Sequence, residues 1–153
     1  MATLTLWAFT PNAHSGITRL FAYAVCIWTV SKWSHIGISI GNKYYEAKPF
    51  VGVHELDSIP KGANHIATWL VKDDKKAQEW INKQLGKSYD WWGIFGFAVG
   101  PSEYGKLDKG HWFCSSFGVE VARKYGIHIC GHTDPWEINP AHLVKSAKKI
   151  VDK

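Results

Sequence analysis

The chain has 153 residues, 46% of them hydrophobic and 20% charged, which is enough for the core of one domain and excludes a disordered chain. Its formal net charge is +5, but the basic residues are dispersed, so we expect no nucleic-acid partner, which would need a concentrated basic stripe. The longest apolar stretch, Ile17 to Val30, contains Arg19 and is too short to cross a membrane, so we expect no transmembrane segment.

A strand and a helix are expected first. Thr3–Phe9 alternates in polarity and is rich in β-forming residues, and Pro11 and Asn12 end it. A helix is predicted from about Ser15 to Thr29, because apolar residues recur there at helical spacing. These residues form a stripe that consists of Ile17, Leu20, Phe21, Ala24, Val25 and Trp28.

A β-hairpin is expected next. Ser34–Ile40 alternates, with its isoleucines on one face and His35 on the other. The pair Gly41-Asn42 favours a tight turn into a return strand, Lys43–Ala47. Pairing around this turn brings Glu46 within a residue or two of His35.

Two strands and three helices complete the pattern. The strands are expected over Gly52–Leu56 and Asn64–Val71. The helices are one that Asp73 or Asp74 caps and that ends before Gly86, one from near Cys114 to Tyr125, and a basic one over about 141–151. A glycine-rich aromatic loop (87–100) and a polar loop (101–110) lie between the first two. The order predicts a single α+β domain over residues 1–153, with an antiparallel sheet packed with helices.

Cys114 is the strongest candidate nucleophile. It stands at the expected start of a helix, where the positive end of the helix dipole favours a thiolate. The N–H groups of the same turn are suited to receive an oxyanion. A cysteine among apolar residues is also commonly an inert core thiol, but Ser115 and Ser116 suit a helix start better than a core.

His35 and Glu46 are the candidate partners of Cys114. A catalytic thiol needs a base, and a histidine base needs an acceptor that fixes its tautomer and orientation. The hairpin places Glu46 where it can orient the His35 imidazole. Each residue alone also fits a structural role, as a strand histidine or as an exposed carboxylate at a sheet edge.

Four further residues are candidates for contacts with a substrate or an oxyanion. The Tyr89 hydroxyl can donate to an oxyanion. Trp91 and Trp92 are candidate cleft walls, and Ser115 is a candidate substrate contact beside the nucleophile. Aromatic side chains also pack in cores, which stays the alternative for the tyrosine and both tryptophans.

Four motifs occur in the order of a known family. They are SHIGISIG with YYEA, GKSYDWWGIFG, WFCSSF and WEINPAHL, spread over roughly residues 3 to 145. They resemble motifs of the permuted papain-like cysteine hydrolases of the NlpC superfamily, YaeF/YiiX type. In chain order, these motifs are the His strand with its return strand, the Gly-x-x-Tyr-Asp segment, the Cys helix and the terminal Ser-Pro-x-x-Leu segment. Ser116 stands where that family often has an acidic residue, and Asn139 replaces the serine of the terminal motif.

The resemblance implies a circularly permuted papain-like, NlpC-type fold with Cys114 as nucleophile, His35 as base, Glu46 as the third polar member and Tyr89 near the oxyanion. It implies a cysteine amidase or peptidase that acts through an acyl-enzyme on a peptide, a peptidoglycan peptide or an acyl substrate. The superfamily also includes lipid acyltransferases, so acyl transfer and thioester hydrolysis are alternatives, and several members occur in phages and viruses. No cofactor or metal is expected.

Two hypotheses of other classes stay open. His111, Cys114, Cys130 and His132 can be combined into a two-Cys, two-His zinc site, although their spacing departs from the usual pattern. The fold can also serve as a catalytically silent binding or inhibitor module, since a fold alone does not establish activity.

The first residues and the cysteines bear on the compartment. Met1–Thr10 lacks the basic start and apolar run of a secretory signal. The chain has 3 cysteines, which cannot all pair internally, and reduced thiols fit the cytosol. We therefore expect a cytoplasmic protein, whose oligomeric state the sequence leaves open.

Overall fold

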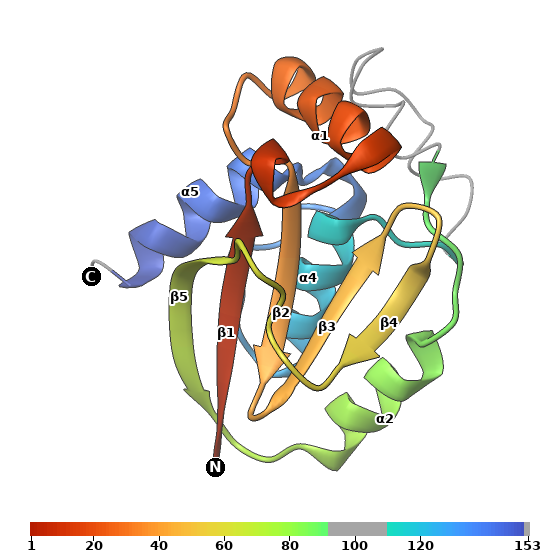
Figure 1. The fold of residues 1–153 in the computed structure, drawn as a ribbon. Coiled ribbons are helices and arrows are strands. Elements are labelled where there is room, and N and C mark those ends of the chain that lie inside the picture. Colours follow the sequence, from red (N-terminus) through yellow and green to blue (C-terminus); the bar gives the residue numbers. More distant parts are fainter. Residues whose placement is uncertain (92–109, 152–153) are drawn as a thin grey trace.

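The computed structural model describes residues 1–91 and 110–151. Its centre is a five-stranded antiparallel sheet in the order β4-β3-β2-β1-β5 (Figure 1). The strands are β1 (Ala2–Phe9), β2 (His35–Ile40), β3 (Lys43–Lys48), β4 (Gly52–Leu56) and β5 (Asn64–Val71). All the expected strands form, so the α+β class with an antiparallel sheet is confirmed.

The helices cover one face and one end of the sheet. They are α1 (Gly16–Trp28), α2 (Lys75–Gln84), α4 (Cys114–Lys124) and α5 (Pro140–Val151), with short 3-10 turns η1 (Pro11–Ala13) and η3 (Pro135–Glu137). In Figure 1, α4 and α5 lie behind the sheet and α1 lies across the end where β1 finishes and β2 begins. Of the two aspartates predicted to cap α2, Asp74 does so, because its carboxylate accepts from the N–H groups of Lys76 and Ala77.

The core lies between the sheet and α4. Ile36 and Ile38 of β2 are completely buried, as is Val121 of α4. Helix and strand approach closely at Gly118, where an added Cβ atom would lie 3.1 Å from a methyl carbon of Ile36. This close packing fixes the first residue of α4 relative to the start of β2.

The register of β2, β3 and β4 gathers polar side chains on the other face of the sheet. Ser39 pairs with Tyr44 across β2 and β3, and Glu46 pairs with His54 across β3 and β4. Because side chains alternate along a strand, His35 lies on the same face as Tyr44, Glu46 and His54. The expected separation of His35 from the isoleucines is therefore confirmed.

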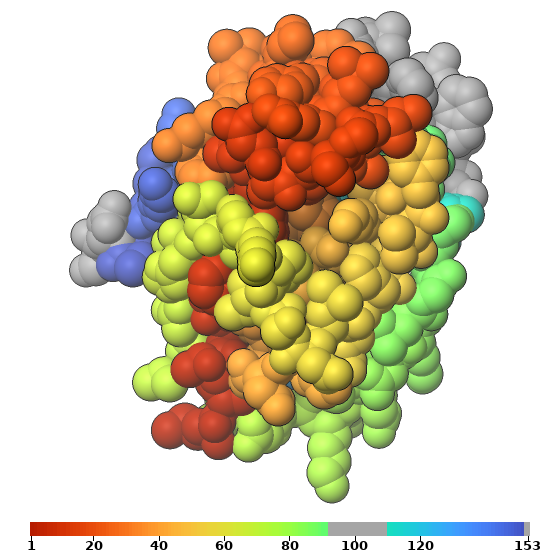
Figure 2. Space-filling model, viewed as in Figure 1, coloured from red at the N-terminus to blue at the C-terminus, as the bar shows by residue number. Residues whose placement is uncertain are grey.

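Helix α1 differs from the other helices, because half of its predicted apolar stripe is exposed. Ile17, Leu20 and Trp28 are exposed, whereas the buried residues of α1 are Ala22 and Val25. The physical reason is that α1 crosses the end of the sheet instead of packing on a face, so the protein covers only one narrow side of it. Figure 2 shows α1 at the upper surface of the molecule.

Some predictions concern residues outside the described ranges. They are Trp92, most of the aromatic loop 87–100 and most of the polar loop 101–110. Within 1–91 and 110–151, no helix has the length and apolar character needed to cross a membrane.

Candidate active site

His35 and Glu46 form a buried pair at the start of β2. The Nε2 atom of His35 lies 2.6 Å from Oε2 of Glu46, and their side chains are only 5% and 4% exposed. The Tyr44 hydroxyl donates to the same carboxylate oxygen at 2.9 Å. His54 approaches the second oxygen, Oε1, with its Nε2 atom at 3.1 Å. Three side chains, one each from β2, β3 and β4, therefore hold the carboxylate in place.

The charges of this cluster support one another. Burial by itself raises the pKa of Glu46, but the charge and hydrogen bond of His35, together with His54, bring that pKa well below its usual range. Burial likewise disfavours the charged imidazole of His35, but the charges of Glu46 and Cys114 raise its pKa above the ordinary value. The hydrogen bond to Glu46 also raises the pKa of His54. Glu46 is thus a carboxylate and His35 is held as an imidazolium.

Cys114 is the first residue of α4 and completes the predicted group. Its side chain is buried and hydrogen-bonds with that of His35. Because Nε2 of His35 faces Glu46, the other ring nitrogen, Nδ1, is left for the thiol. The imidazole therefore bridges a thiol and a carboxylate, which is the arrangement that activates a cysteine nucleophile.

Tyr89 lies against the same cysteine. Its hydroxyl hydrogen-bonds with both the side chain and the backbone of Cys114, and the residue is 5% exposed. Burial, followed by the charges of Cys114 and Asp90, raises the pKa of Tyr89 well above its ordinary value. The hydroxyl stays protonated as a result, so it is available as a hydrogen-bond donor beside Cys114.

The two serines after Cys114 have structural roles. Ser116 takes part in capping α4, because its hydroxyl accepts from the backbone N–H of Phe113 at 3.2 Å. Ser115 is completely buried, and its hydroxyl donates to the carbonyl of Ile138 at 2.6 Å. The hydroxyl of Ser115, predicted to contact a substrate, is instead turned into the protein in this structure, where it links α4 to the chain after η3.

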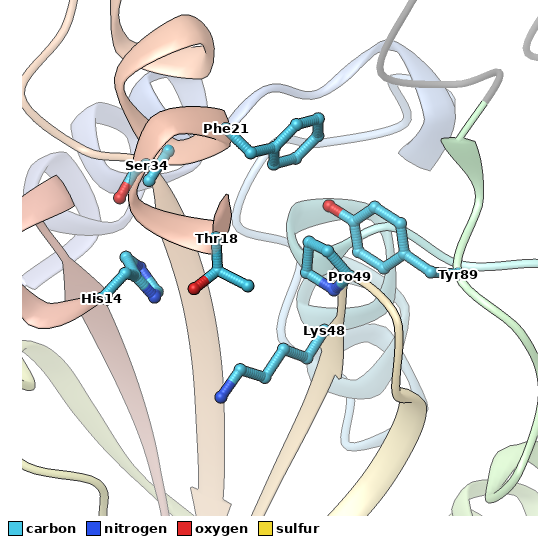
Figure 3. Close-up of a pocket in the computed structure, with 8 residues that line it drawn as sticks. His14, Thr18, Phe21, Ser34, Lys48, Pro49 and Tyr89 are labelled. Atoms are coloured by element: carbon cyan, nitrogen blue, oxygen red, sulfur yellow. The ribbon is translucent and has the colours of Figure 1, made fainter. Parts of the chain in front are cut away.

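A small pocket that is partly open to solvent adjoins this group. Its lining residues come from α1, the start of β2, the end of β3 and the segment before α4: His14, Thr18, Phe21, Ala22, Ser34, Lys48, Pro49 and Tyr89. Figure 3 shows Phe21 and Tyr89 on one side and His14, Thr18 and Lys48 on the other. Tyr89 both lines the pocket and hydrogen-bonds with Cys114, so it lies between the two.

Trp91 forms part of an aromatic wall next to the pocket. Its ring centroid lies 5.3 Å from that of Phe21, 4.8 Å from that of Phe50 and 5.3 Å from that of Tyr89. Trp91, predicted as a cleft wall, thus contacts two residues that line the pocket, whereas Trp92, the other predicted wall residue, lies outside the described part of the chain.

Two histidines of the site were not singled out from the sequence. The ring of His14 packs 5.7 Å from that of His35, and burial, then the charges of His35 and Lys48, lower its pKa to about 4. His14 is therefore a neutral imidazole on the pocket wall, and no signal in the sequence marks it. His54 had a signal, because pairing Gly52–Leu56 with the preceding strand places it opposite Glu46.

The zinc hypothesis has little support in the described residues. Cys114 is engaged by His35 and Tyr89, whereas the ring of His111 contacts the hydroxyl of Ser88. Across 1–91 and 110–151, no three His, Cys, Asp or Glu side chains come together in a way that would hold a metal ion.

The site thus combines a thiol at a helix start, an imidazole, a carboxylate and a tyrosine hydroxyl beside a pocket. Such a set can form a thiolate, attack a carbonyl carbon and stabilise the resulting negative charge on oxygen. No protein-family model matches the chain, and neither does any curated protein or solved structure.

Proposed function

We propose that the protein is a cysteine hydrolase that cleaves an amide or a related acyl bond, with Cys114 as nucleophile and His35 as base. The observation that carries the proposal is the bridging position of His35, between the thiol of Cys114 and the buried carboxylate of Glu46. A lone buried cysteine has no need of such a partner, whereas a nucleophile does.

The first step transfers a proton and forms a bond. His35 holds the proton of the thiol at Nδ1, and its imidazolium is stabilised by Glu46 at Nε2. The thiolate sulfur attacks the carbonyl carbon of the substrate, and the electron pair of the C=O bond moves to oxygen. The oxyanion is stabilised by the backbone N–H at the start of α4 and by the Tyr89 hydroxyl.

The second step expels the leaving group and then releases the product. His35 donates its proton to the leaving nitrogen or oxygen as the bond to carbon breaks, which leaves an acyl group on Cys114. Water then attacks the thioester while His35 accepts a proton from it. The carbon–sulfur bond breaks, the thiolate returns and a carboxylic acid leaves.

The fold that we propose is the circularly permuted papain-like one. Three features support it: the strand that carries His35 precedes the helix that carries Cys114, the cysteine is the first residue of that helix, and the helix packs on the sheet beside the histidine strand. The order of histidine before cysteine is what the permutation requires.

An acyl-enzyme assay tests the proposal. Wild-type protein is mixed with a panel of p-nitrophenyl esters, peptide p-nitroanilides and thioesters, quenched early, digested and searched by mass spectrometry for an acyl adduct. We expect an adduct on Cys114, lost in Cys114→Ala and retained in the matched control Cys26→Ala. If no substrate acylates Cys114, or if the adduct sits on Cys130, the proposal is wrong and a silent binding module becomes the better hypothesis. An added amine that intercepts the acyl group would identify a transferase.

A further inference from the structure

The outward side of α1 and of the residues after it is apolar. Its exposed large side chains are Ile17, Leu20, Tyr23, Ile27, Trp28 and Val30. Leu20, Ile27 and Val30 are 71%, 72% and 93% exposed, which is unusual for so many apolar side chains within one short segment. Scattered surface leucines need no explanation, but a continuous apolar strip of this kind marks an interaction surface.

The apolar surface continues beyond α1. The ring of Trp91 contacts both Phe21 of α1 and Phe50 of the turn between β3 and β4. Phe50 and its neighbour Val51 are exposed. We call α1 with residues 30, 50 and 51 the apolar platform. The pocket of Figure 3 lies between its two parts, because α1 and Pro49 both contribute to the lining.

The charge around the platform is positive. No aspartate or glutamate precedes Glu46 in the chain, whereas Arg19 lies on α1 and Lys32 follows it. Each is near an aromatic ring, Arg19 at 5.9 Å from the centroid of Tyr23 and Lys32 at 4.8 Å from that of Trp33. Within the described ranges, neither cation has a carboxylate partner.

We propose that the apolar platform docks on the surface of a lipid bilayer that contains anionic lipids. An interfacial helix combines an apolar side, aromatic residues and flanking cations, and α1 has all three. Its 13 residues span only about 20 Å, so it lies in the plane of the interface instead of crossing the ~30 Å hydrocarbon layer.

Charge favours lipid over a second copy of the chain. Two copies that met through this platform about a twofold axis would bring Arg19 and Lys32 towards their own equivalents. Anionic headgroups would instead attract both cations. Docking would place the opening of the pocket at the bilayer surface. The docking surface includes none of Cys114, His35 and Glu46, so the docking proposal can be tested independently of the proposed hydrolase activity.

Vesicle flotation tests the docking. The full chain is mixed with vesicles of phosphatidylcholine alone, or with roughly a third phosphatidylglycerol, and the floated fraction is measured. We expect binding to the anionic vesicles, weakened about tenfold or more in Leu20→Glu/Ile27→Glu, since two apolar contacts are lost and two like charges added. The matched control is Leu70→Glu, which changes a leucine that is 75% exposed near the opposite end of the sheet and should bind like wild type.

Two further measurements make the result decisive. Arg19→Gln should weaken binding to anionic vesicles and leave that to neutral vesicles unchanged, and thermal unfolding should show that every variant folds. The proposal is overturned if wild type does not float with either vesicle, or if Leu70→Glu loses as much binding as the double variant. It is also overturned if the lipid-free protein sediments as a dimer that Leu20→Glu/Ile27→Glu dissociates, since the platform would then bind a second copy.

Discussion

The hydroxyl of Tyr44 occupies the space over Gly37, where an added Cβ atom would lie 1.8 Å from the hydroxyl oxygen. From there the hydroxyl donates to Glu46, the carboxylate that contacts His35. The glycine of β2 therefore does more than extend a strand. It leaves room for the ring that holds the carboxylate, so a residue without a functional group determines the geometry of the site.

Replacing this glycine should disturb the site and not only the strand. In Gly37→Ala the new methyl group overlaps the Tyr44 ring, which must move, so we expect a loss of about 1–3 kcal/mol in the free energy of unfolding and reduced acylation of Cys114. Urea denaturation and the acyl-enzyme assay measure the two effects. In the double variant Gly37→Ala/Tyr44→Ala the overlap is gone, so the two stability losses should be far from additive. Additive losses would show that the ring and the glycine do not interact.

The reactivity of the cysteines tests the pairing of Cys114 with His35. Burial raises the pKa of Cys26 and of Cys130, so both should react slowly with iodoacetamide below pH 7. We expect Cys114 to react about tenfold faster than either at pH 6 and to lose this advantage in His35→Ala. Mass spectrometry of digests gives the rate at each cysteine, and His142→Ala, at an exposed position, is the control. Equal rates at all three cysteines would remove the support for a catalytic thiol.

The buried ion pair should make stability depend on pH. The pKa of Glu46 is lowered in the folded state, so its contribution is present above the unfolded value of about 4.3 and is lost as the pH falls. The pKa of His35 is raised, so its contribution is full below about 6.5 and is lost as the pH rises through the folded value. The pair therefore stabilises the protein most between about pH 4.3 and 6.5.

Glu46→Gln isolates this contribution. Urea unfolding of wild type and variant from pH 3 to 9 should show the largest difference, about 1–3 kcal/mol, inside the window and a smaller one on either side. The variant should also show slower alkylation of Cys114, since its His35 is charged less readily. A difference in stability that is the same at every pH would mean that the pair is not ionised as described.

Tyr89→Phe measures the contribution of the hydroxyl to the transition state. With the substrate that acylates the enzyme best, we expect kcat to fall about 10²–10³-fold while KM changes little, because the hydroxyl meets the oxyanion and not the ground state. Alkylation of Cys114 should persist, which separates this effect from loss of the nucleophile. Tyr23→Phe, on the exposed side of α1, serves as the matched control. An unchanged kcat would assign Tyr89 a packing role alone.

The sequence by itself determined the features that depend on near neighbours. Alternation with period two separated His35 from the isoleucines, and the tight turn at Gly41-Asn42 fixed the register that brings Glu46 to it. The start of a helix at Cys114 was likewise readable, because helix starts depend on a few adjacent residues. These are local relations, which the geometry of the chain sets before any tertiary contact forms.

Only the tertiary structure decided which elements meet. The contact between Cys114 and His35 depends on α4 packing against β2 at Gly118, and nothing local to either residue encodes that approach. Ser115 looked available beside the nucleophile, but the turn of α4 directs it inward to Ile138. The spacing of the apolar residues in α1 predicted a helix, but it did not predict which side of that helix the rest of the protein covers. Periodicity defines the faces of an element, whereas packing between distant segments decides what each face contacts.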